Sequence, residues 1–145
     1  MKATKTMIVI ANSGTARFLI NAGPGKGLTP TGGKTLQADP PTMYADRAGE
    51  VHSRVGPGMS AVEQTDPKML AQADFAKEVS DFLETSFEKG NFERLIVAAG
   101  PHMLGVIRDA LSEKVSKVVI AEVDKDLTHL PLEDLPEHLD HVLAV

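Results

Sequence analysis

The sequence predicts one α/β domain over residues 1–145, with helices on the faces of a five-stranded mixed sheet. A length of 145 residues suits one domain, and a chain of this size can bury a core without disulfides or metals. Short apolar runs fill the first third, whereas helical stripes alternate with continuous apolar runs after residue 66. This change of pattern predicts antiparallel strands first and β-α-β units afterwards.

A β-hairpin is predicted at the start of the chain. Thr6–Ala11 and Thr15–Ile20 are apolar, β-branched runs, and residues 12–14 between them are Asn, Ser and Gly. Residues 21–32 are rich in Gly and Pro, which predicts a loop. Residues 34–38 predict a third strand, so we expect the first third to form an antiparallel meander.

Residues 42–65 show no apolar periodicity and predict a long mobile loop within the domain. The segment contains three glycines and one proline. A loop of this length without secondary structure of its own is usually functional or mobile. Both a functional loop and a disordered connection stay open.

A long helix is predicted to begin at Asp66-Pro67, where an N-cap acceptor precedes a proline at the first helical position. Gly90 and Asn91 end it. Its apolar stripe consists of Phe75, Ala76, Val79, Phe82 and Leu83. Another face carries the acids Asp74, Glu78, Asp81 and Glu88, which we interpret as a solvated face rather than a metal site.

The second half continues with strand and helix in alternation. Arg94–Ala99 and Lys117–Val123 read as strands buried on both faces. Gly100-Pro101 begins a helix between them, and residues 131–143 predict one or two short helical turns. Three antiparallel strands followed by right-handed β-α-β crossovers give the topology of the ribonuclease-H-like fold.

Charge is distributed unevenly along the chain. Residues 1–65 hold seven Lys/Arg against four Asp/Glu, and residues 66–145 hold eight against sixteen. This asymmetry is typical of some nucleic-acid-binding proteins, although two differently solvated surfaces explain it as well. If RNA is the partner, we expect contacts from Arg17, Arg47 and Arg54, with Arg17 pointing outward beside an inward Phe18.

The sequence excludes several chemistries. There is no cysteine, so disulfides, zinc–thiolate sites and cysteine nucleophiles are absent. Residues 31–35 end in Gly-Lys-Thr, but Leu28 stands where a phosphate-binding loop needs its first glycine. Pro40 and Pro41 also prevent the helix that such a loop requires.

Few residues remain as candidates for chemistry. The first strand carries no carboxylate for a two-metal nuclease, and we interpret Asp124 and Asp126 as loop or helix-cap acceptors. His102 lies at a strand-to-helix junction, either as an anion contact or as an exposed first-turn residue. None of the serines lies in the glycine-flanked strand-to-helix turn of a nucleophile elbow. We therefore expect no metal and no cofactor.

Five segments together are similar to the bacterial family described as "protein required for attachment to host cells". They are Ile8–Phe18, Thr65–Lys68, Phe75-Ala76, Leu95–Pro101 with Leu104, Gly105 and Arg108, and Asp126–Leu130. The sequence Lys-Asp-Leu-Thr-His at 125–129 is the most specific of them. The family motif residues are Gly100, Pro101, Arg108, Asp126, Thr128 and His129.

That family resembles the middle domain of archaeal and eukaryotic peptide-chain release factors, which has the same ribonuclease-H-like topology. The resemblance implies that residues 42–65 match the release-factor loop whose Gly-Gly-Gln tip acts at the ribosome. Here the candidate tip, Gly56-Pro-Gly58-Met-Ser, lacks Gly-Gly-Gln, and residues 46–49 read Asp-Arg-Ala-Gly where relatives often have Asp-Arg-Pro-Gly. Release-factor hydrolysis therefore does not carry over, and Gly56 and Gly58 remain candidates for partner contact.

Two functions stay open. The favoured one is an interaction protein without catalytic activity, which contacts the ribosome, RNA or another protein. It requires no catalytic group that the sequence fails to show. The alternative is a hydrolase that uses the 42–65 loop on an ester such as peptidyl-tRNA. Because no apolar run suits a membrane span or a signal-peptide core, we expect a cytoplasmic protein without membrane contact.

Overall fold

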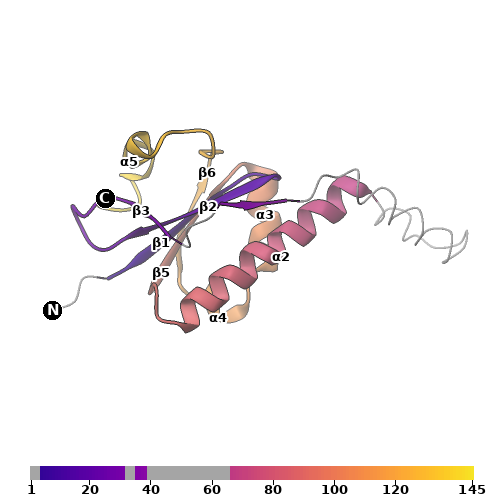
Figure 1. The fold of residues 1–145 in the computed structure, drawn as a ribbon, viewed down its shortest axis with the longest axis horizontal. Helices are drawn as coiled ribbons and strands as arrows, with labels where there is room; N and C mark the ends of the chain where they lie inside the picture. Colours follow the sequence, from indigo (N-terminus) through magenta and orange to yellow (C-terminus); the bar gives the residue numbers. More distant parts are fainter. Residues whose placement is uncertain (1–3, 32–34, 39–65) are drawn as a thin grey trace, which may run out of the picture.

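A mixed β-sheet forms the centre of the protein in this computed structural model, which describes residues 4–31, 35–38 and 66–145. The strand order is β3-β2-β1-β5-β6, and β4 also pairs with β2 (Figure 1). The strands are β1 (Thr6–Ala11), β2 (Thr15–Asn21), β3 (Thr29–Pro30), β4 (Leu36–Gln37), β5 (Arg94–Ala99) and β6 (Val119–Asp124). β1 is antiparallel to β2 and parallel to β5, which is parallel to β6.

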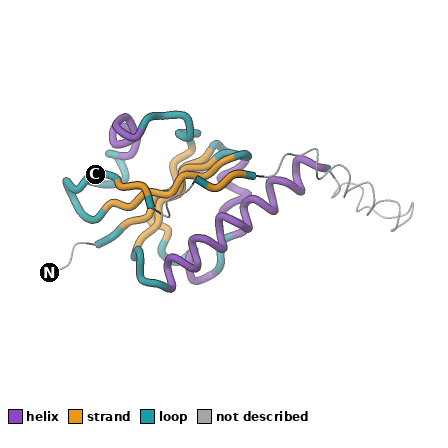
Figure 2. The backbone as a smooth tube through the Cα atoms, in the orientation of Figure 1, coloured by secondary structure: helices purple, strands orange, loops and turns teal. Residues whose placement is uncertain are grey.

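Helices cover the two faces of the sheet unequally, as Figure 2 shows. The helices are α2 (Pro67–Glu88), α3 (Pro101–Ala110), α4 (Glu113–Ser116), the 3₁₀ helix η2 (Leu132–Asp134) and α5 (Leu135–Leu139). The long α2 packs with α3 on one face, whereas α5 and the segment around it cover the other. Within the described residues, no helix combines the length and the apolarity needed to cross a bilayer.

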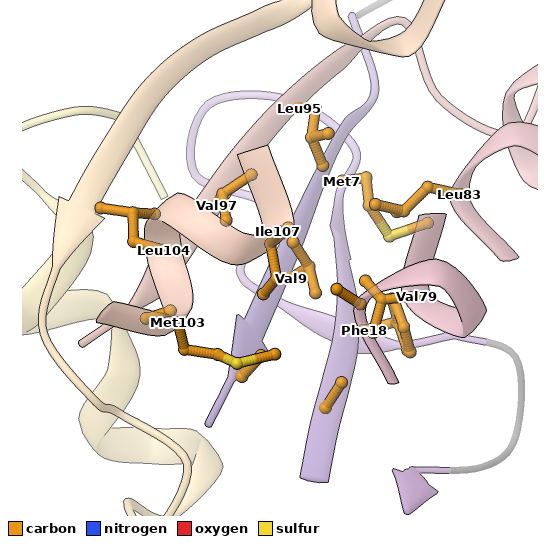
Figure 3. Packing of buried hydrophobic residues seen from close by; sticks show 14 of the residues in the cluster. Met7, Val9, Phe18, Val79, Leu83, Leu95, Val97, Met103, Leu104 and Ile107 are labelled. Atoms are coloured by element: carbon orange, nitrogen blue, oxygen red, sulfur yellow. The ribbon is translucent and has the colours of Figure 1, made fainter. Parts of the chain in front are cut away.

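Alternation along the central strands divides the core into two clusters. Met7 and Val9 face α2 and α3 (Figure 3), and Ile8 and Ile10 face the C-terminal segment. All four are fully buried, and burying one such side chain stabilises the fold by about 1.5–3 kcal/mol. This double burial explains why β1 reads as a continuous apolar run.

Both predicted ends of the long helix are confirmed. The side chain of Asp66 accepts a hydrogen bond from the Lys68 amide at 2.9 Å, which satisfies one of the free donors of the first turn. At the other end Gly90 takes a positive φ of 78°. The amides of Gly90 and Asn91 donate to the carbonyls of Phe87 and Ser86, which is the Schellman pattern.

The sheet differs from the prediction in two places. The sheet has six strands rather than five. The additional strand is the two-residue β3, which lies within the predicted 21–32 loop. The predicted 34–38 strand is present as the two-residue β4. β6 lies at the edge of the sheet, and apart from the buried Val123 its residues alternate between half-exposed and exposed. It was expected to be buried on both faces, but one strand neighbour and a partial helix cover leave Ile120 exposed. The predicted 42–65 loop lies outside the described residues.

Candidate functional site at the carboxyl ends of the parallel strands

A cavity of about 240 Å³ opens where β1 and β5 end. It is lined by Asn12, Ser13, Gln72, Gly100, Pro101, His102, Met103 and Asp126, and we call it the edge pocket. From β1 the chain continues into β2 on one side, and from β5 it continues through α3 into β6 on the other. In open α/β sheets, such a divergence at the carboxyl ends of strands is where ligands bind.

Asn12 shapes the wall that comes from the β1–β2 turn. Its Oδ1 accepts hydrogen bonds from the amides of Gly14 and Thr15, at 2.7 and 2.8 Å. These bonds form an Asx-type turn, which explains the choice of residue at this position. They also fix the position of Ser13 at the edge pocket. The Nδ2 of Asn12 donates to Thr128 Oγ1 at 3.0 Å and so connects the turn with the segment after β6.

Asp126 supplies the carboxylate of the edge pocket. Its Oδ1 accepts from the amide of Thr128 at 2.9 Å and from the Thr128 hydroxyl at 2.5 Å. Partial burial acts to raise the pKa of Asp126, but the two Thr128 hydrogen bonds, the nearby His129 and the Asn12 amide outweigh it and lower the pKa below the usual value. The carboxylate is therefore ionised at neutral pH.

Gln72 and His102 meet across the contact between α2 and α3. His102 Nε2 lies 2.8 Å from Gln72 Oε1, and because a carbonyl oxygen only accepts, the ring proton lies on Nε2. His102 follows Gly100 and Pro101, the N-cap and first residue of α3. Apart from its two chain neighbours, no described residue has an atom within 4 Å of the place where a Cβ on Gly100 would lie, and its φ of −63° suits any residue. Neither packing nor backbone angle therefore requires glycine on this wall.

The structure places Arg17 differently from the solvent-facing position expected for an RNA contact. Arg17 lies on the face opposite Phe18, as alternation predicts, but this face is covered. Its half-buried guanidinium donates to the carbonyl oxygens of Leu130, Thr128 and Leu127 at 2.6, 3.3 and 3.5 Å. Arg17 thus holds the segment after β6 against the sheet.

The family motif residues divide into two groups. Gly100, Pro101 and Asp126 line the edge pocket, and Thr128 supports Asp126. Arg108 lies apart, in a bidentate contact with Glu122 of β6 at 2.9 and 2.5 Å. The Arg108 hydrogen bonds lower the pKa of the Glu122 carboxyl. His129 is exposed. The other candidates, Arg47, Arg54, Gly56 and Gly58, lie outside the described residues.

Sequence reasoning missed three polar residues of the edge pocket. Asn12 and Ser13 follow the first strand directly, so their place at the carboxyl edge could have been inferred from the expected β1–β5 pairing. Gln72 gives no local signal, because its position depends on how α2 packs against α3. Within the described residues, no three His, Asp or Glu side chains are grouped so that they could hold a metal ion.

Solved structures share this fold. An archaeal translation termination factor, aRF1, matches with a TM-score of 0.51 and 18% identity, covering 95% of this chain and 35% of that one. A structure described as an archaeal protein matches with a TM-score of 0.48 and 16% identity, covering 95% and 37%. The chain thus spans about a third of the length of these proteins. The termination-factor likeness confirms the predicted fold class.

Comparison with curated proteins gave no match. The sequence profile of the family described as "Protein required for attachment to host cells" matches residues 7–139. That range includes both walls of the edge pocket, the Thr128–Asp126 contact and Arg17. The chain belongs to this family of proteins required for attachment to host cells.

Proposed function

We propose that this member of the host-attachment family is an interaction protein without catalytic activity that contacts RNA through the carboxyl edge of its sheet. One observation carries the proposal: the described residues on either side of the 39–65 segment lead to the carboxyl edge, where the edge pocket lies. Ala38 donates its amide to the carbonyl of Gly14 at 2.9 Å, beside the β1–β2 turn. On the other side α2 begins at Pro67 and brings Gln72 to the edge pocket.

The choice of RNA is supported by the fold and by the arginines that remain available. The similar archaeal protein is a translation termination factor, so this fold occurs in a protein that works in translation. Arg47 and Arg54 are the cations expected to reach phosphate, because arginine pairs well with phosphate oxygens. Arg17 instead donates from Nη1 to three carbonyl oxygens, so the proposal relies on Arg47 and Arg54. With RNA as its partner, the protein acts in the cytoplasm.

A hydrolase acting on an ester is the second candidate, because Ser13, His102 and Asp126 line the same cavity. In a catalytic triad the serine bonds the histidine, and the histidine bonds the acid. Here His102 Nε2 contacts Gln72, and Asp126 Oδ1 accepts from Thr128. Neither of the two triad hydrogen bonds is present among the described residues, so binding is favoured over catalysis.

Binding of labelled single-stranded RNA to the purified chain, measured by fluorescence anisotropy over a range of salt concentrations, tests the proposal. We expect binding at low salt that weakens as salt is added, since phosphate contacts release counterions. Capture from native cell extract with and without ribonuclease provides the cellular control. No RNA binding at low salt would contradict the proposal. Peptidyl-tRNA hydrolysis that His102→Ala abolishes would instead support the hydrolase.

A further inference from the structure

The edge pocket contains hydrogen-bonding groups that the fold itself does not use. We propose that it binds a vicinal diol, with the Asp126 carboxylate accepting from the hydroxyls and Ser13 and Gln72 completing the contacts. The 3′-terminal ribose of an RNA and a free sugar both carry this group. The inference that the diol belongs to an RNA ribose rests on the proposed function, whereas the inference that the pocket binds a diol does not.

Asp126 provides the acceptor. An ionised carboxylate has about four lone-pair sites on its two oxygens. The hydrogen bonds from Thr128 both reach Oδ1 and fix the orientation of the carboxylate, whereas Asp126 also lines the edge pocket. Beside Oδ1, the carboxylate offers Oδ2 as an acceptor for the diol, as an acidic residue after a strand accepts from a ribose hydroxyl in dinucleotide-binding folds.

Ser13 and Gln72 provide the complementary groups. Gln72 Oε1 is used in the contact with His102. The two N–H donors of the Gln72 amide have no acceptor among the described residues, so they are available to a ligand. The hydroxyl of Ser13 has no partner there either. A hydroxyl group on a ligand both donates and accepts, so it needs a carboxylate on one side and an amide or hydroxyl on the other.

The charge and the volume of the edge pocket restrict the class of ligand further. Among the described residues, the lining has one carboxylate and no lysine or arginine, which favours a neutral hydroxyl group over a phosphate. A volume of about 240 Å³ is below the range of roughly 300–1,000 Å³ usual for drug-sized ligands, so one sugar ring fits and a base lies outside. Pro101 and Met103 give the apolar surface for the C–H face of the ring.

Gly100 supplies an independent observation. Its backbone angle suits any residue, and no described residue beyond its chain neighbours occupies the space beside its Cα. Glycine in such a position allows close approach of a ligand to the backbone. A larger side chain at this position is therefore expected to fill the place of the sugar ring without disturbing the fold.

Titration of the ¹⁵N-labelled full chain with adenosine, 2′-deoxyadenosine and methyl β-D-ribofuranoside, followed by amide NMR signals, tests the proposal. We expect adenosine and the riboside to shift the amide signals of residues 12–14, 100, 102, 103 and 126–128. The deoxynucleoside, which lacks one hydroxyl of the diol, should bind at least tenfold more weakly, because it leaves the carboxylate with one partner. Equal affinity for adenosine and 2′-deoxyadenosine would overturn the proposal.

Substitutions in the edge pocket test whether the riboside binds there. Asp126→Asn keeps an oxygen for Thr128 but loses the charge, and Gly100→Leu fills the space; each should weaken riboside binding at least tenfold with a native amide spectrum. Asp124→Asn, the matched control, removes an acid at the end of β6 that does not line the edge pocket, and should bind as wild type does. Riboside binding that both Asp126→Asn and Gly100→Leu leave intact would refute the site.

The outcomes also separate this inference from the proposed function. Riboside binding without RNA binding supports the diol site and contradicts the RNA function. RNA binding without a response to any diol supports the RNA function and overturns the diol site.

Discussion

The guanidinium of Arg17 in β2 donates to the carbonyl oxygen of Leu130, 2.6 Å away and 113 residues later in the chain. The same Nη1 atom also approaches the carbonyls of Thr128 and Leu127. These residues directly follow Asp126, whose carboxylate lines the edge pocket. Arg17 therefore holds the segment that follows Asp126, and with it one wall of the candidate site, against the sheet.

Removing this contact should destabilise the protein. We expect Arg17→Ala to lower the free energy of unfolding by about 1.5–3 kcal/mol, the usual contribution of hydrogen bonds to a charged group. Arg17→Lys keeps the charge but not the planar fork, and should lie between wild type and Arg17→Ala. Urea denaturation measures both variants. An unchanged midpoint for Arg17→Ala would show that the carbonyl contacts contribute nothing.

A second charge beside Asp126 should alter its ionisation. Asn12→Asp keeps the acceptor for the Gly14 and Thr15 amides but removes the donor to Thr128. Because a like charge then lies near Asp126, we expect the pKa of that carboxyl to rise. The side-chain ¹³C shift of Asp126, followed against pH, measures this. Asn91→Asp adds the same charge beyond the end of α2 and should leave the pKa of Asp126 as it is in wild type.

Asp126 should also make stability depend on pH. Its pKa is lower in the folded protein than in the unfolded chain, where an Asp titrates near about 3.9. The carboxylate therefore stabilises the fold above that value, and the contribution is lost as pH falls through the folded-state pKa.

Asp126→Asn isolates this contribution. We expect the difference in unfolding free energy between wild type and Asp126→Asn to be larger at pH 7 than at pH 3. In a Thr128→Val background, without the hydroxyl donor, the pH dependence of that difference should shrink. Chemical denaturation at the two pH values measures both. A difference that stays constant with pH would mean that Thr128 does not stabilise the ionised form.

Much of the fold could be predicted from sequence because local patterns determine it. Thr6–Ala11 and Arg94–Ala99 read as strands since every residue of β1 is buried and only Arg94 of β5 is partly exposed. Asp66 and Gly90 marked the ends of α2 through capping chemistry. By contrast, β3 consists of only two residues, which is too short to show any alternation.

The candidate site was only partly predictable, because long-range contacts build it. Asp126 and Thr128 were recognised by their family motif, and they do hydrogen-bond each other. The contacts of Arg17 with residues 127–130 and of Gln72 with His102 span 110–113 and 30 positions. Such contacts depend on which sheet face the C-terminal segment covers and on how two helices pack. Neither leaves a periodic signal in the sequence.

The RNA proposal makes a prediction about salt. Arg47 and Arg54 lie outside the described residues, in the segment between Ala38 and Asp66. On single-stranded RNA each phosphate contact contributes about 0.7 to the slope of log affinity against log salt. We expect the double variant Arg47→Ala, Arg54→Ala to reduce that slope by about 1.4, measured by anisotropy with labelled RNA. The double variant Lys89→Ala, Lys114→Ala removes two cations from the end of α2 and from α4, at the opposite edge of the sheet, and should leave it unchanged. An equal slope for wild type and the arginine variant would assign these arginines to surface ion pairs and leave protein as the partner.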